Sequence, residues 1–218
     1  MSGMRSLSPP IRIILVVVLL SLCYLPMAWA WGRMLPSYSR LIAAASESIT
    51  NAIEFSDTSY RIAVDGSDFK VTARMRVMDG VVEKGRYEQS GARPIDLVSY
   101  NLALWGALGL ATILFVSAKA RLRFLLIAPA IIVAWHLCDL MIFAKNTHWV
   151  LAKELHRQFP ALVSYSFSWN WLWWWALELN RRIIDPFLPL ALWLIFCLRS
   201  FLALAAGRKS SNRSSELL

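Results

Sequence analysis

His136 and Asp139 lie three positions apart in an otherwise apolar stretch, AWHLCDLM at 134–141. Residues with this spacing share one side of an α-helix, so an imidazole and a carboxylate would point the same way. Ionisable groups within a membrane are costly and by default indicate a function, here the binding of a partner, a proton or a metal. The alternative is that the dyad hydrogen-bonds a neighbouring helix, as polar side chains in membrane proteins commonly do. The contacts expected in that case are Ser99, Tyr100 and Asn101.

Catalysis by a cysteine beside this dyad is not expected. Cys138 is two positions from His136, and residues two apart point to different sides of a helix. The other histidines, His148 and His156, show no metal-ligand spacing. The chain also lacks a phosphate-binding glycine loop, a serine-nucleophile turn and a zinc-protease motif. The sequence therefore predicts no catalytic residues, no metal and no cofactor.

The composition is typical of an integral membrane protein. Hydrophobic residues make up 57% of the 218 positions and charged residues 17%, below the roughly 25% of a typical soluble domain. The net charge of +9 is concentrated in short segments beside apolar runs, whereas 33–96 carries nine basic and nine acidic residues. Basic residues in this pattern indicate orientation in a membrane and not a nucleic-acid surface.

The apolar runs predict a mainly α-helical, polytopic membrane protein with about four transmembrane helices and a small external α+β domain. About 20 apolar residues are enough to cross a bilayer as a helix. The predicted segments, in order, are a cytoplasmic N-terminus at 1–12, transmembrane helices at 13–32, 97–118, 124–144 and 183–206, an external domain at 33–96, a cytoplasmic turn at 119–123, an external aromatic-rich segment at 145–182 and a disordered cytoplasmic tail at 207–218.

The first apolar run has two interpretations. It follows two arginines and is long enough to cross the membrane as a retained anchor. The alternative is a cleaved signal peptide, because Ala28-Trp29-Ala30 has small residues at the spacing of a cleavage site. A retained anchor is favoured because the bulky side chains of Trp29 and Trp31 flank that site.

The external domain at 33–96 is expected to hold one helix and an antiparallel β-meander. Apolar residues from Leu35 to Ile53 recur every three or four positions, which is typical of an amphipathic helix. Apolar and polar residues then alternate along DFKVTARMRVM, as in a strand with one buried face. Asp65-Gly66 and Asp79-Gly80 are turn signals on either side of this strand. The exposed row Lys70, Arg74 and Arg76 is expected to be solvated, with an acidic ligand as the alternative.

The segment 145–182 is expected to lie at the outer membrane interface. Its tryptophans suit that place, where an indole ring keeps one edge in water, and Asp185-Pro186 predicts the start of the last helix. The interfacial aromatic belt is Trp169, Trp171, Trp173, Trp174 and Trp175.

The basic flanks predict the orientation of the chain. With four crossings, the basic N-terminus, turn and tail all face the cytoplasm, whereas a fifth crossing at 161–179 would move the tail outside. The expected localisation is the bacterial inner membrane, with 33–96 and 145–182 on the periplasmic side. The lipid bilayer is then one partner of the chain.

The layout resembles that of the exosortase H-associated family of small membrane proteins. The resemblance rests on ARPIDLVSYNLALWGALGLA at 92–111 and IIDPFLPLALWLIF at 183–196. It implies an accessory role beside a membrane-embedded cysteine transpeptidase, and it implies no catalytic residues in this chain. The best-matching positions are Pro94, Tyr100, Pro186, Pro189 and Trp193.

Three functional hypotheses follow from these features. The first is a non-enzymatic accessory or assembly subunit that binds another membrane protein, an exosortase-like transpeptidase if the resemblance holds. The second is a membrane enzyme or carrier that uses His136 and Asp139. The third is a membrane sensor whose external domain binds a ligand.

Overall fold

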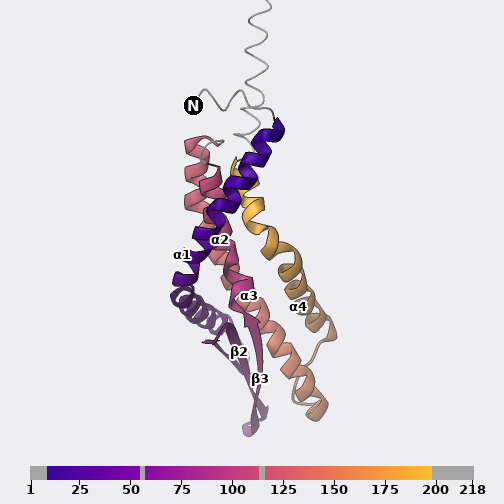
Figure 1. Ribbon diagram of the computed structural model, residues 1–218. Coiled ribbons are helices and arrows are strands. Elements are labelled where there is room, and N and C mark those ends of the chain that lie inside the picture. The colour runs from indigo at the N-terminus through magenta and orange to yellow at the C-terminus, as the bar shows by residue number, and fades with distance from the viewer. Residues whose placement is uncertain (1–8, 55–56, 113–115, 198–218) are drawn as a thin grey trace, which may run out of the picture. The chain divides into compact units, whose positions relative to one another are not determined.

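The computed structural model describes residues 9–54, 57–112 and 116–197. Figure 1 labels most of its elements, which are α1 (Pro9–Ala52), β1 (Thr58–Asp65), β2 (Asp68–Asp79), β3 (Val82–Pro94), α2 (Ile95–Ala111), α3 (Ala118–Gln158), α4 (Phe167–Leu179) and a π-helical turn, η2 (Asn180–Ile184). An α-helical stretch continues from η2 to residue 197. The protein is therefore mostly helical with one small sheet, as the sequence predicts. The predicted tail at 207–218 and most of the predicted N-terminal segment at 1–12 lie outside the described residues.

Two of these helices are long and apolar enough to cross a membrane, Val17–Ala52 within α1 and Ala118–Gln158, which is α3. The complete α1 and α3 have 44 and 41 residues, or about 66 and 62 Å at the helical rise. This supports two candidate spans where four were predicted. α2 has 17 residues, near the lower limit for a crossing, and the predicted span at 183–206 is described only up to residue 197.

Both long helices extend past their predicted ends. α1 was expected to stop near residue 32 and to be followed by a separate helix, but it continues without a break to Ala52. The junction contains Arg33, Met34 and Leu35, which are all strong helix formers. α3 likewise continues beyond residue 144 to Gln158. Its last residues, LAKELHRQ, are mostly strong helix formers, whereas NTHWV before them is not, and Leu151, Ala152 and Leu155 pack into the core.

The chain divides into two compact units, and α1 and α3 contribute residues to both. The first unit comprises Met1–Arg33, Tyr100–Ile132 and Phe187–Leu218. Within it, the indole Nε1 of Trp105 donates to the Phe124 carbonyl at 3.4 Å, and the Phe124 ring packs 6.5 Å from that of Phe196. Helical segments from α2, α3 and the C-terminal stretch therefore pack together in this unit.

The second unit comprises Met34–Ser99 and Val133–Pro186 and contains the sheet. The strands are antiparallel in the order β1-β2-β3. Gly66 and Gly80 adopt φ angles of 61° and 60°, left-handed conformations that favour glycine in a tight turn. These are the two turns that the Asp-Gly pairs predict, and the meander itself is confirmed.

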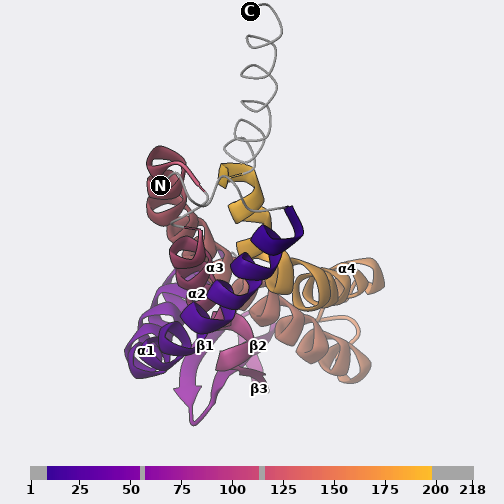
Figure 2. The same cartoon turned by 45° about the horizontal axis from the view of Figure 1, so that its top comes forward.

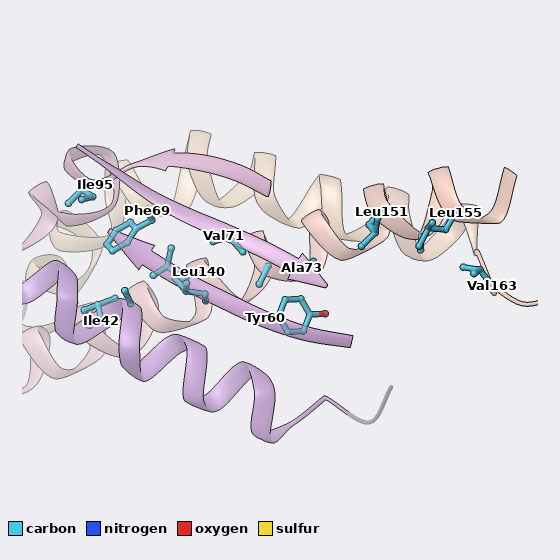
Figure 3. Packing of buried hydrophobic residues seen from close by; sticks show 14 of the residues in the cluster. Ile42, Tyr60, Phe69, Val71, Ala73, Ile95, Leu140, Leu151, Leu155 and Val163 are labelled. Atoms are coloured by element: carbon cyan, nitrogen blue, oxygen red, sulfur yellow. The ribbon is translucent and has the colours of Figure 1, made fainter. Parts of the chain in front are cut away.

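The core of the second unit forms between one face of the sheet and the two long helices. The alternation predicted for β2 is confirmed, because Phe69, Val71 and Ala73 are fully buried. Figure 3 shows them near Ile42 of α1 and near Leu140 of α3. The buried residues of this core are Ile42, Ala43, Tyr60, Ile62, Phe69, Val71, Ala73, Val77, Ile95, Leu140, Ala144, Leu151, Ala152, Leu155 and Val163.

The free edge of β1 is bonded by side chains of α1. Asn51 donates to the Tyr60 carbonyl and accepts from the Tyr60 amide, both at 2.8 Å. Glu47 accepts from the Ile62 amide at 2.8 Å. Figure 2 shows the C-terminal half of α1 beside the strands. These bonds satisfy backbone groups that an open edge would offer to another chain.

Candidate functional site

The predicted dyad lies on the buried side of α3. His136 and Asp139 have no exposed surface, whereas Cys138 between them is exposed. This is the arrangement that the i, i+3 spacing predicts, and it separates the thiol from the imidazole. The dyad is therefore part of the protein interior and not of its surface.

Asp139 is held by one residue of the sheet and one of the π-helical turn. The Arg93 Nη2 donates to Asp139 Oδ1 at 2.7 Å, and the side-chain amide of Asn180 donates to the same oxygen. Arg93 Nη2 also donates to Asp185 Oδ2 at 3.2 Å. Arg93 and Asp185 are 6% and 3% exposed. One buried guanidinium thus bridges two buried carboxyl groups.

Trp135 completes this arrangement from the neighbouring position on α3. Its indole Nε1 donates to Asn180 Oδ1 at 2.7 Å and to Asp185 Oδ1 at 3.0 Å. Asn180 lies in η2, a type of helical turn that is frequent at functional sites. We refer to Arg93, Trp135, His136, Asp139, Asn180 and Asp185, together with Tyr38, as the buried cluster.

His136 joins the buried cluster to α1. Its Nδ1 shares a hydrogen bond with the hydroxyl of Tyr38. The two rings also meet edge to face, with centroids 5.8 Å apart and planes at 79°. His136 and Asp139 thus bind different elements of the fold.

The hydrogen bonds of the dyad go to residues that the sequence did not single out. Ser99, Tyr100 and Asn101 were proposed as possible contacts, and the bonds of His136 and Asp139 within the described residues go to Tyr38, Arg93 and Asn180. The side chains of Ser99 and Asn101 are buried and make no hydrogen bond within the described residues. Similar depth in the membrane does not identify Tyr38, Arg93 or Asn180, because strand pairing and helix packing decide which side chains meet.

Arg93 and Asp185 were not identified from sequence. Arg93 pairs with Phe69 across the sheet, so it points to the same face as the core residues of β2. Placing Arg93 on that face requires knowledge of the β2–β3 register. The mostly polar residues of β3 show no alternation from which that register could be inferred. Asp185 was interpreted as a helix start, but it lies inside a helical run from residue 167 to 197. A buried carboxylate needs a partner, and Asp185 finds it in Arg93.

A second polar group fixes the end of α1 to α3 and β1. Glu54 accepts a bond from Lys145 and another from the Tyr60 hydroxyl, the latter at 2.9 Å. The Lys145 ammonium lies 5.3 Å from the centre of the Tyr60 ring. The pKa of Tyr60 is raised above its usual value, mainly by burial and secondly by the nearby Glu54 carboxylate. Its hydroxyl therefore remains a proton donor. This group is a structural contact.

The basic row on the outer face of the sheet is largely balanced by acidic neighbours. Lys70 lies 3.7 Å from Asp65, and Arg74 lies 3.0 Å from Glu88. The Arg76 guanidinium lies near Glu83. The pKa of that carboxyl group is lowered mainly by its hydrogen bond from Arg86 and also by Arg76. A hollow of about 620 Å³ lies at the start of β1, where residues from both faces of the sheet line it: Asp57, Thr58, Ser59, Arg74, Met75, Arg76, Arg86, Tyr87 and Glu88.

The predicted aromatic belt lies on α4. No residue of this helix is buried in the described structure. Trp171 and Trp174 each pack against Trp175, with ring centroids 5.7 and 5.6 Å apart. Trp169 and Trp173 belong to the same helix. A helix that exposes tryptophans in this way suits a lipid interface.

The chemistry open to the buried cluster is limited by its closure. Asp139 Oδ2, His136 Nε2 and Arg93 Nε are buried and have no hydrogen-bond partner within the described residues. The same part of the chain holds no group of three or more metal-ligating side chains. The cluster can therefore store a charge or a proton, but in this conformation it offers no path to a bulky substrate.

No protein-family model, curated protein or solved structure matches the chain.

Proposed function

We propose that this chain is a non-enzymatic integral membrane subunit that binds another membrane protein. In this proposal the buried cluster holds the second unit together and carries out no turnover. The chain crosses the bacterial inner membrane with both termini in the cytoplasm. It contributes the folded periplasmic domain and the aromatic helix α4 to the assembly.

The observation that carries this proposal is the way the dyad is used. Asp139 bonds Arg93 and Asn180, and His136 bonds Tyr38, so both side chains connect elements of the same unit. Both are fully buried. A catalytic acid or base has to reach the proton that it transfers, and a fully enclosed group in this conformation does not reach a substrate.

The membrane part of the proposal rests on the surface of the first unit. Large apolar side chains are exposed on every helical segment of this unit, among them Leu25, Leu110, Leu126 and Ile195. A water-soluble protein rarely exposes so large an apolar surface, whereas lipid covers it in a membrane. The exposed side chains come from four segments, which favours the four-crossing arrangement.

The nature of the partner is proposed from the sequence resemblance. An accessory role beside an exosortase-like transpeptidase would fit a membrane protein with a small external domain. The domain then contacts the transpeptidase or its substrate on the periplasmic side.

Affinity purification in mild detergent tests this function. The tagged wild-type chain is compared with Asp139→Asn, which preserves the shape of the cluster, and with His136→Ala, which removes the bond to Tyr38. We expect a stoichiometric membrane protein to accompany the wild type and Asp139→Asn. With His136→Ala, the amount of this co-purified protein should fall only in proportion to the loss of folded chain. A well-folded chain that purifies alone from its native membrane would refute the subunit proposal.

A second candidate, a membrane enzyme or carrier that uses the dyad, is favoured by one observation. Asp139 Oδ2 and His136 Nε2 both retain unused hydrogen-bonding capacity inside the protein. If these atoms carry a reaction or transport, Asp139→Asn abolishes activity while leaving the fold and the assembly intact. A fully functional Asp139→Asn variant in cells excludes this candidate.

A further inference from the structure

The buried cluster carries an unbalanced charge when its groups have their ordinary ionisation. Arg93 contributes one positive charge, Asp139 and Asp185 contribute two negative charges, and a neutral His136 contributes none. The groups that other elements add to the cluster, Tyr38 from α1, Trp135 from α3 and Asn180 from η2, are neutral. The sum is one excess negative charge.

An excess charge in this place is strongly unfavourable. The four ionisable side chains are between 0% and 6% exposed, so water does not solvate them. No other cation forms an ion pair with Asp139 or Asp185 within the described residues. A buried charge without a partner usually neutralises by taking up or losing a proton. The cluster therefore needs one additional positive charge.

The hydrogen bonds distinguish the two carboxyl groups. Asp185 accepts at both oxygens, from Trp135 at Oδ1 and from Arg93 at Oδ2. That is how an ionised carboxylate, which can only accept, is satisfied. Asp139 accepts twice at Oδ1 and has no donor at Oδ2. A protonated acid has this asymmetry, because one oxygen is a carbonyl and the other carries the proton.

His136 provides an acceptor for that proton. Its Nε2 is buried, has no hydrogen-bond partner within the described residues, and belongs to a side chain one helical turn before Asp139. The two atoms do not bond each other directly. A buried water with polar partners on both sides is a common way to satisfy such a pair. In the tautomer with hydrogen on Nδ1, the Tyr38 oxygen accepts and Nε2 is free to accept from this water.

We propose that Asp139 is a proton-binding site: the folded protein holds one proton on Asp139 Oδ2 at neutral pH, linked through a water to His136 Nε2. Asp185 and Arg93 form the ion pair of the cluster, and the cluster as a whole is neutral. The proton comes from solvent during folding and no other bond is made or broken. This inference does not depend on the identity of a partner or on the subunit function.

Infrared spectroscopy of the purified protein tests the assignment directly. The carbonyl stretch of a protonated carboxyl group is separate from that of a carboxylate, and we expect the wild type to show this band at neutral pH. Asp139→Asn should lose the band, because asparagine replaces the neutral acid with a neutral amide of the same shape. In Asp185→Asn the band should also disappear, because Asp139 is then the only carboxyl group beside Arg93 and ionises to balance its charge. The control Glu88→Gln, at an exposed carboxylate of the same sheet, should retain the band. A wild type without the band, or a band that persists in Asp139→Asn, would overturn the proposal.

Unfolding measurements give an independent readout. Since a proton held only by the folded state is released on unfolding, the denaturation midpoint of the wild type should fall as the pH rises through neutrality. The midpoint of Asp139→Asn should equal that of the wild type at low pH and lack this dependence. If Asp139 instead binds a sodium or potassium ion, the wild-type midpoint will follow the concentration of that ion and the infrared band will be absent, which contradicts the proposal.

Discussion

Replacing Arg93 with methionine tests whether the buried cluster stabilises the fold. Methionine has an unbranched side chain that fills much of the same space without a charge. The Arg93 Nη2 donates to Asp139 at 2.7 Å and to Asp185 at 3.2 Å, so its removal leaves buried carboxyl groups without their cation. Breaking a buried ion pair on one side typically costs about 3–5 kcal/mol of the free energy of unfolding.

The matched control is Arg74→Met in the same sheet. Arg74 also pairs with a carboxylate, Glu88 at 3.0 Å, but its side chain is 52% exposed. An exposed pair of this kind contributes only about 0.2–1 kcal/mol. Both variants exchange an arginine for methionine on neighbouring strands, so the difference between them isolates the effect of burial.

The assay is thermal unfolding in detergent, followed by tryptophan fluorescence. For a chain of this length, 1 kcal/mol shifts the Tm by about 2–4 °C. We therefore expect a decrease of about 6–20 °C for Arg93→Met and of no more than about 4 °C for Arg74→Met. Equal shifts in the two variants would show that Arg93 is not paired in a dry interior and would refute the reasoning on which the buried cluster rests.

Three further predictions concern other parts of the chain. Asn51→Ala should lower the free energy of unfolding by about 1–3 kcal/mol, measured by denaturant titration, because two backbone groups of Tyr60 lose their bonds at 2.8 Å; an unchanged midpoint would mean that water replaces Asn51 without cost. Gly91→Ala should cost about 1–3 kcal/mol in the same titration, because its Cβ would lie 2.9 Å from Phe143 Cζ. Gly32→Ala, with open space around the new Cβ, should instead stabilise α1 by up to about 1 kcal/mol, and a loss in both variants would argue against the contact of Gly91 with α3. The orientation is tested by cysteine labelling in a background without native cysteines. Val81→Cys lies at a hairpin position that is 96% exposed and should react with a membrane-impermeant maleimide from the periplasm, whereas Lys119→Cys should react only after the cells are opened. Labelling of both from one side would contradict the proposed orientation.

Local patterns in the sequence predict several elements of the fold. The alternation along β2 identifies Phe69, Val71 and Ala73 as core residues because side chains of a strand alternate between its faces. The two Asp-Gly pairs identify the hairpin turns because glycine accepts positive φ. The i, i+3 spacing places His136 and Asp139 on one side of α3. Each of these inferences depends on residues within one turn of helix or one hairpin.

The helix boundaries were less accessible from sequence. A change from apolar to charged residues was taken as the end of a span near residues 32 and 144, yet both helices continue. Polarity indicates which environment surrounds a helix. Whether the backbone stays helical depends on hydrogen bonds, propensity and packing. Propensity alone does not explain it, because Pro36 follows the first position and Asn146 and Thr147 follow the second. Both extensions contribute side chains to the core of the second unit, and that packing keeps them helical.

The sequence by itself determined that the chain has long apolar helices, a small antiparallel meander and a histidine–aspartate dyad. Only the tertiary structure decided what the dyad binds. Arg93 lies 46 positions from Asp139 and 92 from Asp185, and Tyr38 lies 98 positions from His136. Contacts over such separations depend on strand register and helix packing, which no local pattern encodes. The burial that makes these charges expensive, and so gives the cluster its importance, likewise exists only when the second unit is folded.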